Sequence, residues 1–176
     1  MTIRAALTLA AGVLALAACS PKPADVGSNE ILPSTETATD AAPAGDPSPF
    51  MGTWRTESSV LAPWADPAAG FEANPEFAST EVVLTPTTST GPGIVQCEQT
   101  KYEVITLGAP ELFEGNLSKP VEQAAALGLT GDEWPVLREG CVSSTGDLEL
   151  LFVLADKDTL KLGLDNIVYT LKRIAP

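Results

Sequence analysis

The chain has 176 residues, with 23 Asp and Glu against 10 Lys and Arg, so that its formal net charge is −13. Such an acidic chain offers no basic patch to nucleic acid or anionic head groups, and we expect neither as a partner. It contains no histidine, which removes the commonest general base and the commonest metal ligand, so we expect no cofactor and no metal site.

The first residues indicate that the protein is secreted across a membrane. Residues 1–18 carry one positive charge, Arg4, followed by an apolar run that is short for a bilayer span and typical of a signal peptide. The run closes on Leu-Ala-Ala-Cys at 16–19, which resembles the lipobox of bacterial lipoproteins. The resemblance implies that Cys19 is acylated, with palmitate or similar chains, and becomes the mature N-terminus. Because Ser20 follows rather than Asp, it also implies the periplasmic leaflet of the outer membrane. The alternative is an ordinary signal peptide with a chance cysteine.

Residues 19–49 are expected to form the acylated cysteine and a tether. The segment after Cys19 is rich in Pro, Ala, Thr, Ser, Asp and Glu, with almost no large apolar side chain, so it buries too little surface to offset its ordering entropy. Residues 50–176 have the length of one globular domain with one core. This domain has 18 Asp and Glu and 8 Lys and Arg, a net charge of −10, which suits solubility or a cationic protein partner.

The two ends of the domain carry a resemblance to a known family. Gly52-Thr53-Trp54 looks like the Gly-x-Trp that begins the first strand of lipocalins and related small barrels, and we expect that strand at 52–58. In that family an arginine near the end of the last strand packs across the tryptophan, and Arg173 occupies the matching place. The resemblance implies a lipocalin-like barrel. The alternative is that Trp54 is a plain core aromatic and Arg173 a solvated edge charge.

A long irregular stretch, 60–77, follows the first strand. Several prolines and a glycine interrupt it, and long loops of this kind are typically lids or binding loops. Its aromatic side chains need something to pack on. We therefore expect either a gate over a ligand cavity or, preferably, a plug that fills one end of the barrel. The candidate lid or barrel-end residues are Trp54, Leu61, Trp64, Phe71, Phe77, Tyr169 and Arg173.

The middle of the domain alternates between short strands and turns. Period-two patterns and turn residues predict strands at 81–85, 94–97, 101–107 and 136–143. The one clear helix is expected at 119–127, with Ser118 as N-cap, Pro120 in the first turn and Gly128 after its end. Cys97 and Cys141 are expected to pair, because two cysteines in one secreted domain usually do.

The C-terminal stretch, 147–174, gives the clearest pattern. Three apolar sets alternate along it and predict three antiparallel strands, with Asp165-Asn166 as a tight turn. With the preceding strands this predicts a mainly β domain: an antiparallel up-and-down barrel of seven or eight strands with one short helix. A flattened β-sandwich is the alternative.

We find no catalytic motif and predict a protein that is not an enzyme. No nucleophile elbow surrounds Ser143 or Ser144, and acidic pairs arise often in so acidic a chain. The leading hypothesis is an outer-membrane-anchored periplasmic lipoprotein whose barrel binds a small apolar or amphipathic ligand. The alternatives are an inhibitor or assembly partner of an envelope protein, such as a lysozyme or protease, acting through the barrel rim, and an envelope scaffold without ligand.

Overall fold

The computed structural model describes residues 45–143 and 146–174. All of them belong to one compact unit. The expected signal peptide, the acylation site at Cys19 and nearly all of the expected tether lie outside the described residues.

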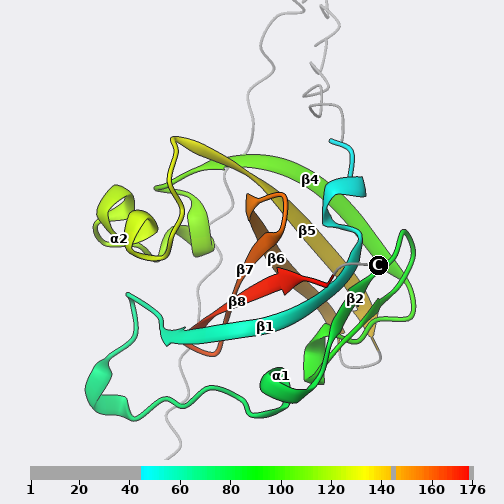
Figure 1. Cartoon of the computed structure of the whole chain (residues 1–176), viewed down its shortest axis with the longest axis horizontal. Helices are drawn as coiled ribbons and strands as arrows, with labels where there is room; N and C mark the ends of the chain where they lie inside the picture. Colours follow the sequence, from blue (N-terminus) through cyan, green and yellow to red (C-terminus); the bar gives the residue numbers. More distant parts are fainter. Residues whose placement is uncertain (1–44, 144–145, 175–176) are drawn as a thin grey trace, which may run out of the picture. The chain divides into compact units, whose positions relative to one another are not determined.

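The domain is built on one antiparallel sheet of eight strands (Figure 1). The strands are β1 (Gly52–Leu61), β2 (Val82–Leu84), β3 (Ser89–Thr90), β4 (Thr100–Gly108), β5 (Glu133–Ser143), β6 (Gly146–Asp156), β7 (Thr159–Leu164) and β8 (Ile167–Arg173). Their order in the sheet is β3-β2-β1-β8-β7-β6-β5-β4, so the first strand pairs with the last. This is the predicted up-and-down barrel, nearly closed, and the sandwich alternative is not adopted.

The helices are short and lie between the strands. They are α1 (Glu76–Ser79) and α2 (Pro120–Ala126), with 3-10 helices η1 (Ser48–Phe50), η2 (Pro67–Ala69), η3 (Gly93–Val95) and η4 (Leu112–Gly115). The helix predicted at 119–127 is confirmed as α2, with Pro120 at its first position. Its N-cap is Lys119, so the expectation for Ser118 was wrong, and the Lys119 side chain makes no capping hydrogen bond.

Two strand predictions needed correction. The strand expected at 94–97 is the helix η3 followed by an isolated bridge at Cys97, because Pro92 and a left-handed Gly93 turn the chain there. The first strand runs on to Leu61, so the irregular stretch begins at Ala62 rather than Val60. The three-strand C-terminal meander is confirmed, with Asp165 and Asn166 both at positive φ in the β7–β8 turn.

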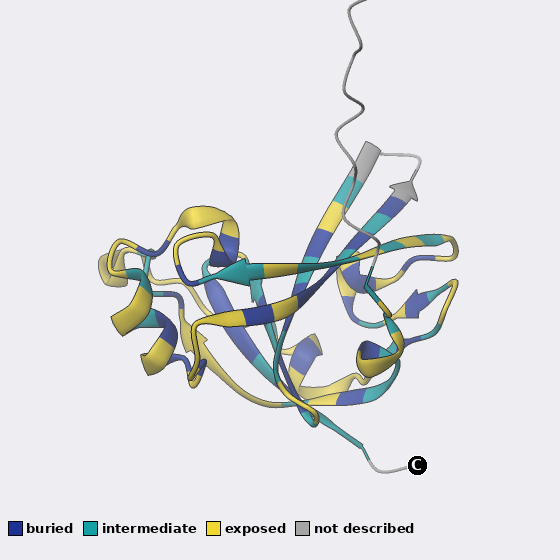
Figure 2. Ribbon diagram, turned by 90° about the horizontal axis from the view of Figure 1, so that it is seen from above, coloured by how far each residue is buried: buried dark blue, intermediate teal, exposed yellow. Residues whose placement is uncertain are grey.

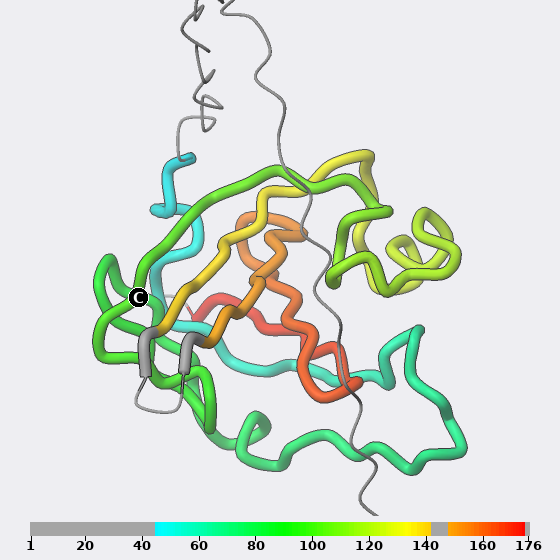
Figure 3. Tube along the Cα trace, turned by 180° about the vertical axis from the view of Figure 1, so that it is seen from behind, coloured from blue at the N-terminus to red at the C-terminus, as the bar shows by residue number. Residues whose placement is uncertain are grey.

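The barrel is held closed between its edge strands β3 and β4. Ser89 and Cys97 form an antiparallel bridge, and the Thr100 N–H donates to the Thr87 carbonyl at 3.0 Å. The predicted disulfide between Cys97 and Cys141 spans the same place. We call these contacts the seam. Figure 3 follows the trace around the barrel, with β1 in cyan beside β8 in red.

The sheet has a core on each face. Residues that alternate inward along the strands form the interior, which is packed with large side chains: Phe50, Trp54, Phe77, Phe152, Leu160, Leu162, Tyr169 and Leu171. The opposite face of β5, β6 and β8 carries Val136, Val153 and Val168, and the segment 109–131, with α2, covers it. Because both faces are covered in places, neighbouring residues of β8 are buried in succession, whereas the second half of β1 is exposed (Figure 2).

Candidate functional site

The most distinctive hollow lies where β6 and β7 part. Their pairing begins at Phe152 with Leu162 and runs toward the β6–β7 turn, so residues 148–151 of β6 have no β7 partner. On the other side of the gap, Gly163 and Leu164 pair only with β8. A pocket of about 250 Å³ occupies this divergence. We call it the wedge pocket. In Figure 2, β5 and β6 run side by side and extend past the neighbouring strands.

An aromatic pair forms one wall of the wedge pocket. The ring of Trp64 lies against that of Phe113, with centroids 5.3 Å apart and an interplanar angle of 37°. The absence of a side chain at Gly163 permits this, because a Cβ there would lie 2.9 Å from the Phe113 ring and 3.4 Å from Trp64. The glycine thus lets both rings rest on β7.

The backbone that presents Phe113 is held in an unusual conformation. Phe113 and Glu114 both have positive φ, 50° and 60°. Two consecutive left-handed residues that are not glycine cost free energy and persist only where their surroundings determine them. Here the Asn116 side chain donates to the Phe113 carbonyl at 2.8 Å, and Phe113 itself is buried. This backbone conformation therefore places the Phe113 ring in the wall of the pocket and Glu114 at its rim.

The remaining lining divides into an apolar floor and an acidic rim. Leu148, Leu150, Leu151 and Leu164 supply the floor, and Ile94, 44% exposed, lies at the mouth. Glu114, Glu149 and Asp165 supply carboxylates, whereas no Lys or Arg of the described chain lines the pocket. Glu149 is paired with Arg138 at 3.2 Å. The arrangement can hold an apolar group and favours positive charge beside it.

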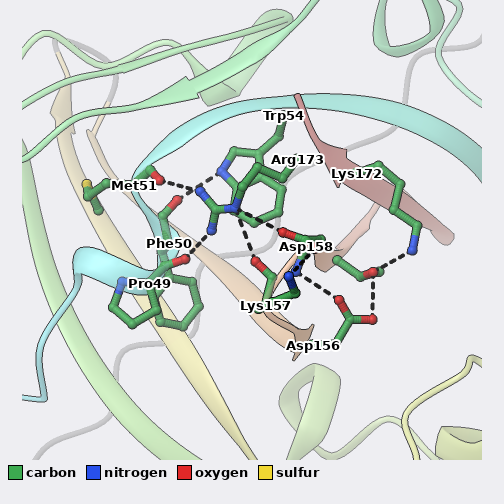
Figure 4. Close-up of polar contacts among 10 residues, drawn as sticks. Pro49, Phe50, Met51, Trp54, Asp156, Lys157, Asp158, Lys172 and Arg173 are labelled. Atoms are coloured by element: carbon green, nitrogen blue, oxygen red, sulfur yellow. Dashed lines mark hydrogen bonds and ion pairs between the residues drawn. The ribbon is translucent and has the colours of Figure 1, made fainter. Parts of the chain in front are cut away.

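Arg173 fastens the other end of the barrel (Figure 4). Its guanidinium lies 4.0 Å from the centre of the Trp54 ring. It donates to the carbonyl oxygens of Met51, at 2.6 Å, and of Pro49. Trp54 in turn donates its indole N–H to the Phe50 carbonyl at 2.9 Å. The contact expected from the Gly-x-Trp start is therefore present, and it ties the entry segment to the last strand. A more open hollow of about 540 Å³ lies beside it.

A buried carboxyl group sits at the seam. Glu139 of β5 is 1% exposed, and its Oε1 contacts the buried Ser89 hydroxyl. That hydroxyl also lies 2.8 Å from the Val95 carbonyl, which can only accept. The Ser89 hydroxyl, with its single proton, therefore lies between two oxygen acceptors, the Val95 carbonyl and Oε1 of Glu139. Burial also raises the pKa of Glu139, an effect that the Ser89 hydrogen bond opposes. Burial likewise raises the pKa of the neighbouring Tyr102 to about 12.

The structure separates the residues proposed from the sequence as a lid or barrel end. Phe77 enters the interior and stacks on Tyr169, with ring centroids 4.3 Å apart, so it fills the barrel as a plug does. Trp64 packs instead with the outer core and lines the wedge pocket. Phe71, after the left-handed turn at Gly70, is 42% exposed, and Leu61 is 37% exposed. The expectation that Trp64 and Phe71 fill the barrel was therefore wrong.

Sequence reasoning missed most of the wedge pocket. Neither Phe113 nor the carboxylates of the rim carry a local signal that sets them apart. Gly163 does, because a glycine between leucines in a strand indicates a close approach by another group. In the described ranges, no cluster of three Cys, Asp or Glu residues could hold a metal ion. Nor does any helix in those ranges have the length and hydropathy to span a membrane.

Comparisons with known proteins found no relative of this chain. No protein-family model, no curated protein and no solved structure matches the chain.

Proposed function

We propose that the protein is a lipid-anchored binding protein of the periplasmic side of the outer membrane, and that the wedge pocket holds the apolar part of an amphipathic ligand. The observation that carries the binding proposal is the pocket itself. Two aromatic rings and several leucines face a gap of about 250 Å³ in the barrel wall. Binding sites are typically concave and apolar with a few polar groups at the edge.

The packed interior supports this location. Large side chains, among them Trp54, Phe77 and Tyr169, fill the space that a hollow barrel would offer to a ligand. The wedge pocket lies in the barrel wall, where Leu150 of that core forms part of its floor, and its volume is already open to a ligand. A group of a few carbon atoms suits its volume, and the rest of an amphipathic ligand would lie over the rim.

The proposed anchor rests on the lipobox-like sequence at 16–19 and the tether that follows it. Acyl chains on Cys19 would hold the domain at the membrane, since each buried CH₂ contributes roughly 0.8 kcal/mol. Mass spectrometry of the mature protein should give an acylated N-terminus at Cys19, and Cys19→Ser should release the protein from membranes. An unacylated N-terminus at another residue would refute the anchor.

The binding proposal is tested with a neutral apolar fluorophore, N-phenyl-1-naphthylamine. The protein is residues 19–176 with Cys19→Ser, so that no acyl chain competes for the probe. We expect saturable binding of about one probe per chain. Because Trp64 is the only one of the three tryptophans that is not buried, its fluorescence should be the one that responds.

Two variants of the same irregular segment provide the contrast. Trp64→Ala removes a pocket wall and should weaken probe binding about tenfold or more. Phe71→Ala removes an exposed ring outside the pocket lining and should leave probe binding unchanged. Equal effects of the two substitutions, or no saturable binding to the parent protein, would contradict the proposed site.

A further inference from the structure

The wedge pocket has a feature that a site for a small molecule does not need. Along 148–151, β6 pairs with β5 on one side and has no strand partner on the other. In an antiparallel strand, alternate residues direct their N–H and C=O groups toward a given side. Part of the backbone of this stretch is therefore open to pairing, and the pocket lies directly against it.

We propose that the ligand of the wedge pocket is an extended peptide segment of a cationic partner protein, which adds as a strand to the open edge of β6. The inference rests on the proposed function, because it names the ligand of the same pocket. Strand addition uses backbone hydrogen bonds for affinity and pockets for alternate side chains for specificity. Here one apolar side chain of the segment enters between Trp64, Phe113 and the leucines of the floor. The four open residues span about 13 Å, room for a segment of similar length.

Charge identifies the kind of segment. Glu114 and Asp165 at the rim make no ion pair within the described chain, and Glu149 is 57% exposed beside Arg138. A Lys or Arg next to the apolar side chain would meet these carboxylates. The chain's own segment 21–49 is a poor occupant, because it carries five Asp and Glu and one Lys. The complementary occupant is a basic segment of another protein.

The test uses acetyl-Lys-Val-Leu-Val-Lys-amide and the same protein as the fluorophore assay. We expect the peptide to bind at one per chain, to displace N-phenyl-1-naphthylamine and to slow amide hydrogen exchange within 148–151. Two N-methylated versions of the peptide, with methyl groups on odd or on even residues, distinguish strand addition from side-chain binding. Since only one edge of the peptide pairs with β6, one version should lose at least about tenfold in affinity and the other should retain it.

Charge is tested separately. The peptide with Glu in place of both Lys should bind at least about tenfold more weakly, and the difference should shrink as salt is added. Glu114→Gln with Asp165→Asn should weaken the Lys peptide roughly threefold or more. The second change keeps a residue that tolerates the left-handed turn. Glu72→Gln, an exposed carboxylate outside the pocket lining, is the matched control and should have no effect.

The possible results of these binding experiments test different parts of the proposal. Equal binding of the peptide and both methylated versions would overturn strand addition. Binding of the fluorophore without any of the peptides would overturn the peptide ligand and leave the proposed function standing. Equal binding of the Lys and Glu peptides would overturn the cationic partner. If neither fluorophore nor peptide binds, the proposed function itself fails.

Discussion

The guanidinium of Arg173 lies over the indole of Trp54, with its carbon 4.0 Å from the ring centre. The two residues are paired across the β1–β8 junction and so join the first and last strands of the barrel. The same guanidinium donates to two carbonyl oxygens of the entry segment. One side chain therefore covers a core aromatic and fixes the chain that leads into the domain.

Arg173→Lys should reduce the free energy of unfolding by about 1–3 kcal/mol, because lysine keeps the charge but cannot reach both carbonyls while stacking on the ring. Urea unfolding measures the change. Arg55→Lys is the control, since Arg55 pairs with Glu81 at an exposed site and its replacement should cost less than about 0.5 kcal/mol. Equal costs at the two positions would contradict a fastening role for Arg173.

The Cys97–Cys141 disulfide joins the connection between the edge strands β3 and β4 to β5, so its removal should loosen the barrel there. Replacing both cysteines with serine should lower the free energy of unfolding by roughly 2–5 kcal/mol. Thiol counting on the unfolded, unreduced domain should give no reactive thiol at either position. Amide exchange should rise first in β3 and at the start of β4. Reactive thiols in the secreted protein would refute the bridge.

Because the carboxyl group of Glu139 is buried, the free energy of unfolding of the domain should depend on pH. Its pKa is raised from the ordinary value of 4.5, so the folded state binds a proton more tightly than the unfolded state. Its contribution is therefore greatest below pH 4.5 and declines as the pH rises through the raised folded pKa. Glu139→Gln removes the titrating carboxyl group and keeps a polar side chain beside Ser89, so it should gain stability relative to the parent as the pH rises across that range. Urea unfolding of both proteins in a pH series measures the difference, and a difference independent of pH would contradict the assignment.

Gly163→Ala should disturb the wedge pocket. The added methyl group would lie 2.9 Å from the Phe113 ring, which must shift against its neighbours. We expect a cost of about 1–3 kcal/mol in the free energy of unfolding and a change in probe affinity. Gly140→Ala is the matched control, since a Cβ in that strand meets its nearest atom at 3.7 Å. A neutral effect at Gly163 would show that the ring is not confined by β7.

Local pattern was enough for much of the fold. The alternation in 147–174 and the Asp165-Asn166 turn predicted the C-terminal strands, because side-chain period and turn chemistry are properties of neighbouring residues. The helix at 120–126 followed from its proline and its terminal glycine. The strand prediction at 94–97 was wrong, because two apolar residues in a short run fit a strand and a 3-10 turn equally well.

The sequence by itself determined most of the strands and the disulfide pair, and its resemblance to lipocalins predicted the contact between Trp54 and Arg173. Tertiary structure alone decided the site. One wall of the wedge pocket is the ring of Phe113, which lies against Gly163 about 50 residues away in the chain and is presented by a left-handed backbone. Likewise, Glu139 shares the inward face of Leu137 and Cys141, but its raised pKa depends on burial beside Ser89 at the seam. Such contacts join residues far apart in the sequence, so the pattern of neighbouring residues does not reveal them.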